Sequence, residues 1–231
     1  MRAYILCGGF GTRLQSVAQG GQKALVAVQG VPFLQGVLTQ LAQAGIDQAV
    51  LCAHYRADQM VEQMPSLSRA SGLALRLVVE AEPLGTGGAL LNALREQPAQ
   101  ARYLVINADT YLDAPAYRLA VEAPGNAILG VSVDDRSRYG SLQVDAAGRL
   151  CAVQEKGVSG PGLINAGVYA FTASAFAGHC VQACSLEREL LPGLLSRGPM
   201  GVCQYQGRFI DIGTPESFAR YANDFHRSVT P

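Results

Sequence analysis

The sequence has no excess of positive or negative charge. Its 18 basic and 18 acidic side chains balance to a formal net charge of zero, and lysine and arginine form no run. A protein that binds nucleic acid or an anionic membrane surface carries a basic patch as its electrostatic footprint. The sequence therefore predicts neither a nucleic-acid partner nor a membrane partner.

Long hydrophobic runs and patterned cysteines are also absent. The apolar run after Met1-Arg2 ends at Cys7, which is too short for a signal peptide or a membrane span. We therefore expect the chain to stay in the cytoplasm. The six cysteines are too sparse for a disulfide scaffold and are expected to be small buried side chains. Cys180 and Cys184 follow His179 without a second pair, so no structural metal site is predicted there.

The 231 residues contain no internal repeat, low-complexity stretch or long linker. This length suffices for a large core and lies within the range of one α/β unit. We expect a single domain over residues 1–231.

The opening stretch is the most informative part of the chain. The apolar run Ala3–Cys7 leads into Gly8, Gly9 and Gly11, and Arg13 and Lys23 follow. Glycines allow backbone N–H groups to approach a polyanion closely, and the two cations can bind the same charge. The pattern predicts a buried strand that ends in a phosphate-binding loop. A tight strand-to-helix corner is the alternative.

Two better-known phosphate loops are excluded by spacing. A dinucleotide fingerprint would need a glycine at position 14, where the chain has Leu14. A Walker-type loop would need glycine before the lysine and serine or threonine after it, but Lys23 lies between Gln22 and Ala24.

Apolar runs and helical periodicities alternate along the chain. This alternation predicts a Rossmann-like three-layer α/β/α sandwich with a mostly parallel mixed sheet, whose ligands bind beyond the carboxyl ends of the strands. Strands are expected at 3–7, 26–28, 48–53, 73–80, 102–106, 128–133, 141–144, 149–154 and 163–171, and helices at 33–41, 56–64, 89–95 and 185–191.

Two aspartates stand at predicted strand ends a hundred residues apart. Asp109 follows the strand 102–106, and Asp211 ends an apolar stretch before Thr214, a predicted N-cap. Two carboxylates at one edge of a sheet can share Mg2+, which also binds substrate phosphates. We therefore expect a magnesium site at Asp109 and Asp211. Taken alone, an aspartate at a strand end such as Asp109 is usually a helix or turn cap.

The opening stretch resembles the signature of the sugar-phosphate nucleotidylyltransferases, which is Gly-Gly-x-Gly-Thr-Arg-Leu followed by Pro-Lys-Pro. Here Gln22 and Ala24 replace the two prolines, whereas Lys23 keeps its place. The resemblance implies that Arg13 and Lys23 are catalytic and that the aspartate pair holds the metal. It also implies that the nucleotide contacts the following residues: Leu6, Gly8, Gly9, Gly11 and Thr12.

In that family the loop at Gly85 and Thr86 reads the base, together with a side chain at the position of Glu80. A carboxylate only accepts hydrogen bonds, so it suits guanine, which offers two adjacent donors. Uracil offers one donor between acceptors and suits a carboxamide better. This favours GTP, unless Glu80 binds the protein backbone instead.

The resemblance also assigns residues to the sugar 1-phosphate. These are Gly140, Glu155, Lys156 and Asn165. Glu155 and Asn165 can bind sugar hydroxyls, and Lys156 can pair with the phosphate. Residues 1–110 would then form the nucleotide-binding half, and residues 111–231 the acceptor-binding half with a C-terminal helix.

These observations predict an enzyme that condenses GTP with a sugar 1-phosphate to give a nucleotide sugar and pyrophosphate. The sequence most resembles the branch that uses D-glycero-α-D-manno-heptose 1-phosphate. Transfer of guanylyl to mannose 1-phosphate and transfer of uridylyl are alternatives within the family. A non-catalytic subunit that senses a nucleotide sugar is an alternative of another class. A homo-oligomer is left open.

Overall fold

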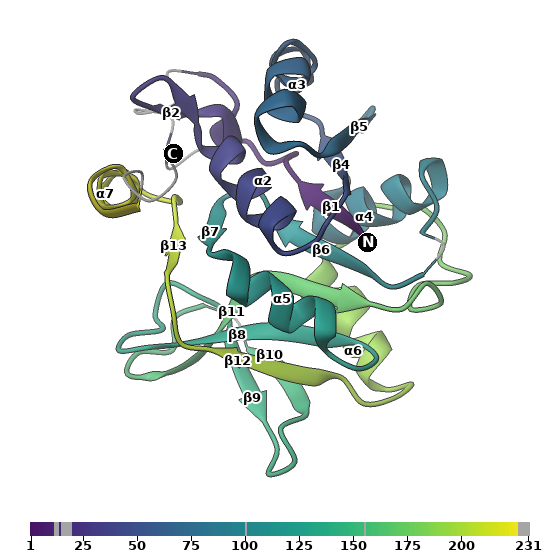
Figure 1. Cartoon of the computed structure of the whole chain (residues 1–231). Coiled ribbons are helices and arrows are strands. Elements are labelled where there is room, and N and C mark those ends of the chain that lie inside the picture. The colour runs from purple at the N-terminus through teal and green to yellow at the C-terminus, as the bar shows by residue number, and fades with distance from the viewer. Residues whose placement is uncertain (12–13, 15–19, 100, 155, 226–231) are drawn as a thin grey trace.

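A computed structural model describes residues 1–11, 14, 20–99, 101–154 and 156–225 (Figure 1). Its strands, in chain order, are β1 (Arg2–Leu6), β2 (Ala27–Val28), β3 (Val31–Pro32), β4 (Gln48–Ala53), β5 (Ala74–Val79), β6 (Tyr103–Asn107), β7 (Thr110–Leu112), β8 (Ala127–Val133), β9 (Ser141–Val144), β10 (Leu150–Gln154), β11 (Gly162–Phe171), β12 (Gly201–Tyr205) and β13 (Phe209–Asp211). Its helical segments are η2 (Lys23–Leu25), α2 (Phe33–Gln43), α3 (Ala57–Ser71), α4 (Gly85–Glu96), α5 (Ala114–Glu122), η3 (Leu186–Leu190), α6 (Leu191–Leu195), α7 (Pro215–Arg220) and η4 (Tyr221–Phe225).

The central sheet is mixed and mostly parallel, as the alternation of strands and helices predicted. Its main path runs β12-β8-β11-β6-β1-β4-β5, and the β9–β10 hairpin pairs with β11. Only β11 runs against the other strands of this path. Leu6 of β1 is in register with Cys52 and Asn107 on its two neighbours. Their carboxyl ends therefore meet at one edge, which is where ligands bind in such sheets.

Helices cover both faces of the sheet because successive strand residues point to opposite sides. On β1, Ala3 and Ile5 pack in one core with α2, α3 and α5, whereas Tyr4 packs in another with α4, η3 and α6. Figure 1 shows α2 and α5 along one face. The three-layer α/β/α sandwich is confirmed. The part of the chain that the structure describes contains no helix long and apolar enough to cross a membrane.

The C-terminal part of the chain returns to the carboxyl edge of the sheet. Strand β12 pairs with β8, and β13 then crosses to pair antiparallel with β7, which opposes Asp211 to Thr110 (Figure 1). The N–H of Ile212 donates to the carbonyl of Asp109 at 2.9 Å. Pairing of β13 with β7 thus brings the two predicted metal ligands together from distant parts of the sequence.

Several elements differ from those predicted. Helix α3 continues to Ser71 instead of ending near residue 64, although it contains Pro65. One proline removes a single helix hydrogen bond, and the helix ends where Gly72 adopts a positive φ of 75°. Strand β7, helix α5 and strand β12 were not predicted at all. The predicted N-cap Thr214 is confirmed, since its side chain accepts a backbone hydrogen bond from its helix, and Ser185 caps η3 in the same way.

Candidate active site

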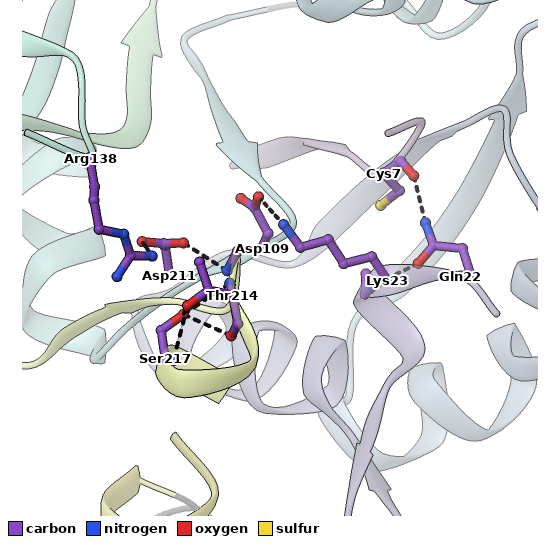
Figure 2. A network of polar contacts seen from close by, with 10 residues as sticks. Cys7, Gln22, Lys23, Asp109, Arg138, Asp211, Thr214 and Ser217 are labelled. Atoms are coloured by element: carbon purple, nitrogen blue, oxygen red, sulfur yellow. Dashed lines mark hydrogen bonds and ion pairs between the residues drawn. The ribbon is translucent and has the colours of Figure 1, made fainter. Parts of the chain in front are cut away.

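Lys23 is held at the carboxyl edge of β1 by its neighbour Gln22. The buried Gln22 side chain donates to the Cys7 carbonyl at 2.5 Å and accepts from the Ala24 N–H at 2.5 Å (Figure 2). Its backbone N–H donates to the Gln59 side chain at 2.8 Å. A glutamine therefore supplies, through side-chain hydrogen bonds, the local restraint that a proline would supply through its ring.

The Lys23 ammonium forms an ion pair with Asp109. Nζ lies 2.7 Å from Oδ2, and the two side chains are 16% and 40% exposed (Figure 2). Burial by itself raises the pKa of the Asp109 carboxyl, but the charge and hydrogen bond of Lys23 outweigh it, so that pKa lies below its ordinary value. Asp109 is therefore an anion at neutral pH.

Asp211 is restrained from two sides. Its Oδ1 accepts from the Gly213 N–H at 2.7 Å, and its Oδ2 lies 3.3 Å from the Arg138 guanidinium (Figure 2). Asp109 and Asp211 line the same cavity. Among the described residues, three or more His, Cys, Asp or Glu side chains nowhere gather to hold a metal. A cation bound by this aspartate pair would need further oxygen ligands, and Mg2+ usually takes these from water and substrate phosphates.

Two adjoining cavities open at the carboxyl edge of the sheet. The first has a volume of about 350 Å3, and the second of about 330 Å3. Both are lined by the same four side chains at their junction: Lys23, Thr86, Asn107 and Asp109. Two substrates placed in these cavities would meet beside the Lys23–Asp109 ion pair.

The first cavity, here called the nucleotide-side cavity, is lined largely by backbone and small residues. The structure brings to it every described residue that the sequence assigned to the nucleotide: Leu6, Gly8, Gly9, Gly11, Glu80, Gly85 and Thr86. Thr12 and Arg13 lie outside the described residues. A side chain would be strained or crowded at several of these glycines, Gly85 with its φ of 71° among them. Gly11 has a φ of 59°, and a Cβ on Gly8 would lie 3.0 Å from Glu80 Oε1.

Glu80 is buried at the wall of the nucleotide-side cavity. Its Oε2 accepts from the Leu84 N–H at 2.9 Å, whereas its Oε1 is buried without a hydrogen-bond partner. Burial raises the pKa of this carboxyl above its ordinary value. One oxygen therefore binds the protein backbone, as the sequence left open, and the other remains available as an acceptor.

The second cavity, here called the acceptor-side cavity, is lined mainly by polar and charged side chains. Of the residues assigned to the sugar phosphate, Gly140, Lys156 and Asn165 line it, while Glu155 lies outside the described residues. Asn165 is fixed by two hydrogen bonds, from the Gly167 N–H at 2.9 Å and to the Tyr169 hydroxyl at 2.7 Å.

The structure brings to the site three side chains that the sequence did not assign to a substrate. Arg138 and Asn107 line the acceptor-side cavity, and the buried Asn107 Oδ1 has no hydrogen-bond partner among the described residues. Glu187 lies on the predicted helix 185–191, where a solvated face was the favoured place and the site the alternative; its half-buried side chain lines the same cavity. Two of these side chains could have been found from their neighbours in the sequence. Arg138 lies close to Gly140, which was assigned to the acceptor, and Asn107 lies two residues before Asp109, which was assigned to the metal.

The cysteines take no part in disulfides among the described residues. Cys7, Cys52 and Cys184 are buried, whereas Cys151 and Cys180 are exposed. The expectation of small buried side chains therefore holds for only part of the set.

Known proteins of one family match almost the whole length of this chain. A family model described as nucleotidyl transferase matches residues 2–228. The chain belongs to the nucleotidyl transferase family. It is therefore an enzyme of nucleotidyl transfer, and enzymes of this class commonly use a divalent metal.

Named relatives are similar over most of the chain. D-glycero-alpha-D-manno-heptose 1-phosphate guanylyltransferase of Campylobacter jejuni is 30% identical over 221 residues, which is 96% of this chain and 98% of that protein. Mannose-1-phosphate guanylyltransferase catalytic subunit beta of Drosophila melanogaster is 32% identical over 225 residues, but this chain covers only 60% of its length.

Solved structures of similar proteins have the same fold as this chain. HddC from Yersinia pseudotuberculosis has a TM-score of 0.85 and 34% sequence identity, covering 97% of this chain and 99% of that chain. A second structure of HddC, in complex with GMP-PN, has a TM-score of 0.84. This member of the nucleotidyl transferase family thus shares its architecture with a protein that has been solved in complex with GMP-PN.

Proposed function

We propose that this nucleotidyltransferase condenses GTP with D-glycero-α-D-manno-heptose 1-phosphate to give GDP-heptose and pyrophosphate. The observation that carries the proposal is the junction of two cavities at Lys23 and Asp109. The similarity of the chain, almost from end to end, to a heptose 1-phosphate guanylyltransferase supports the choice of substrates. Residues 1–110 would supply most of the nucleotide side and residues 111–231 most of the acceptor side, within one domain.

The proposed reaction is an in-line displacement. An oxygen of the sugar 1-phosphate attacks the α-phosphorus of GTP, a new P–O bond forms, and the bond to the pyrophosphate oxygen breaks. Because the attacking phosphate is already an anion, the enzyme needs no covalent intermediate. Its contribution is alignment of the reactants and neutralisation of their charge.

Lys23 is positioned to steady the α-phosphate because it faces both cavities. Arg13 is assigned from the sequence to draw charge onto the leaving pyrophosphate. Lys156 would bind the acceptor phosphate, and Gly140, Glu155 and Asn165 would bind its sugar. Asp109 and Asp211 would hold Mg2+, whose chemistry is to neutralise the phosphates; their carboxylate oxygens line one cavity and suit this hard cation.

The unpaired Oε1 of Glu80 supports guanine as the base. A buried acceptor without a partner is costly, and a donor on the nucleotide would relieve that cost. Guanine presents N1–H and an exocyclic amine on one edge, with Gly85 and Thr86 lining the same cavity. GTP and sugar phosphates are cytoplasmic metabolites, so we place the proposed reaction in the cytoplasm.

Pyrophosphate release from a panel of nucleotides and sugar phosphates tests the proposal. With Mg2+ present, we expect GTP and heptose 1-phosphate to give the highest kcat/KM of the panel. Faster turnover of mannose 1-phosphate would favour the second candidate, which the Drosophila relative supports. Preference for UTP would overturn the assignment of Glu80. Tight binding of a nucleotide sugar without any turnover would indicate the sensing subunit.

A further inference from the structure

The charged side chain of Glu187 has not been assigned to either substrate. It lines the acceptor-side cavity and is hydrogen-bonded to Thr86, which lines both cavities. Glu187 lies in η3 and has both carboxylate oxygens engaged. Oε1 accepts from the Tyr169 hydroxyl at 2.8 Å. Oε2 accepts from the Thr86 hydroxyl at 2.9 Å and from the Ser185 hydroxyl at 3.2 Å. Three donors from separate segments thus converge on one carboxylate.

The hydrogen bonds on the Tyr169 side can run in one direction only. A carboxylate has no proton to give, so the Tyr169 hydroxyl must donate to Glu187. The hydroxyl can then only accept at its other contact, which is the Asn165 amide nitrogen at 2.7 Å. Tyr169 is fully buried, and burial raises the pKa of its phenol well above the ordinary value, so the proton stays on the ring oxygen.

This direction requires the same orientation of Asn165 as its second hydrogen bond, from the Gly167 N–H. Its amide nitrogen must point to Tyr169, and its oxygen accepts from the Gly167 N–H at 2.9 Å. The amide nitrogen has two N–H groups and uses one of them. The second N–H is left for the acceptor-side cavity, which Asn165 lines. The Gly167 N–H and the Glu187 carboxylate, which acts through Tyr169, thus favour the same orientation of this amide.

On the nucleotide side the same carboxylate orients Thr86. The Thr86 hydroxyl accepts from the Leu186 N–H at 2.8 Å and donates to Glu187. Thr86 lines both cavities, at the start of α4. Its hydroxyl proton is therefore directed away from both substrates, and its remaining lone pair is what it can offer them.

We propose that Glu187 is a positioning residue that orients Asn165, through Tyr169, as a hydrogen-bond donor to the acceptor and at the same time orients Thr86 at the nucleotide. The inference rests on the proposed function for the roles of the two cavities. The group that Asn165 recognises is an acceptor oxygen of the sugar phosphate, and the alignment of the two substrates depends on one buried charge.

Glu187→Gln tests the proposal because it keeps the shape and replaces one acceptor by an N–H donor. If the new N–H faces Tyr169, the Tyr169 hydroxyl must accept from it and can donate only toward Asn165, whose N–H already points there. If the new N–H faces Thr86, the Thr86 hydroxyl lies between this N–H and the Leu186 N–H. Glu189→Gln is the matched control on the same turn, since exposed Glu189 accepts from the Ser185 N–H at 2.7 Å and is not among the cavity residues. We expect Glu187→Gln to raise the KM for the acceptor about tenfold, in line with one unsatisfied buried group, and Glu189→Gln to change it less than twofold.

Tyr169→Phe separates positioning from general stability. It breaks the chain to Asn165 but leaves Thr86 bonded to Glu187, so only the KM for the acceptor should rise. The double variant Glu187→Gln/Tyr169→Phe should have an acceptor KM no higher than the worse single variant. Unchanged KM in Glu187→Gln, or effects of the two substitutions that multiply, would overturn the proposal. A lowered Tm with no KM split would mean that Glu187 only stabilises the fold.

An NMR measurement that needs no substrate turnover tests the positioning role independently of the substrates proposed above. In protein labelled with 15N at asparagine, the Asn165 side-chain signal, assigned by its loss in Asn165→Asp, should be the same in wild type and Glu189→Gln. It should move in Glu187→Gln and in Tyr169→Phe. An unmoved signal contradicts the positioning role even if GTP and heptose 1-phosphate are the substrates. A moved signal together with turnover of another pair would reject those substrates and retain the role of Glu187.

Discussion

The two cavities are built in opposite ways. The nucleotide-side cavity is walled by glycines and strand ends from residues 6–109, and the buried carboxylate among its described lining residues is Glu80. The acceptor-side cavity is assembled from segments between Lys23 and Gly213 and carries charged side chains, among them Arg138, Lys156 and Asp211. Backbone shape therefore governs the first cavity and side-chain charge the second. Substitutions should reveal this difference in which substrate each one affects.

The largest effect is expected where the two cavities meet. Lys23→Ala removes a cation placed at the developing charge, so kcat/KM should fall by about 10²–10³ while the fold persists. Lys156→Ala is the matched control, because this exposed lysine lines the acceptor-side cavity alone. Its effect should be smaller and confined to the KM for the sugar phosphate. Steady-state pyrophosphate release and thermal unfolding measure both variants. Near-normal turnover of Lys23→Ala would refute its assignment.

A glycine substitution tests whether backbone shape governs the nucleotide side. Gly85 has a φ of 71°, and a Cβ there would lie 2.7 Å from the Cys184 carbonyl oxygen. Gly125 has a similar φ of 63° but open space around it. Gly125→Ala should therefore lose about 1–2 kcal/mol of unfolding free energy, from the left-handed backbone alone.

Gly85→Ala should lose more than Gly125→Ala, because the steric conflict adds to the same backbone cost. It should also weaken GTP binding, while the KM for the acceptor stays nearly constant. Urea unfolding and nucleotide titration provide the two measurements. Equal destabilisation by the two substitutions would mean that the contact with Cys184 is relieved without cost.

The base preference depends on the buried oxygen of Glu80. Glu80→Gln exchanges an acceptor for a mixed donor and acceptor, so kcat/KM for GTP should fall about tenfold relative to UTP, the loss expected for one mismatched hydrogen bond. The KM for the acceptor should not change. Glu82→Gln serves as the control, because the exposed Glu82 is not among the cavity residues. An unaltered GTP to UTP ratio would show that Glu80 serves only the Leu84 N–H.

The same contrast explains what the sequence could predict. Gly8, Gly9 and Gly11 follow an apolar strand directly, and Asp109 lies just beyond another, so local pattern was enough to predict that they lie at the same edge of the sheet, where they line one cavity. The acceptor side depends on β13 crossing to β7, a strand of three residues with no pattern of its own. Arg138 meets Asp211 of β13 there, and Glu187 reaches the cavity through tertiary contacts with Thr86 and Tyr169. Local periodicity therefore carried no information about either side chain.

The smallest expected effect is a difference in pH dependence between the two carboxylates. Burial raises the pKa of Glu80, so above that raised value the charged form destabilises the fold, and stability is regained as pH falls toward the ordinary value of about 4.3. The pKa of Asp109 is lowered by Lys23, so its contribution is present above the ordinary value of about 3.9 and is lost as pH falls through the lowered one.

Urea unfolding between pH 7 and pH 3 of wild type, Glu80→Gln and Asp109→Asn compares these two contributions. At neutral pH, Glu80→Gln is relieved of a buried charge and Asp109→Asn has lost an ion pair. The stability gained by Glu80→Gln should shrink first on acidification, because the pKa of Glu80 is the higher of the two. The stability lost in Asp109→Asn should shrink only at lower pH. If both differences vanished over the same pH range, the two carboxylates would share one electrostatic environment, and the contrast between the cavities would not extend to their charges.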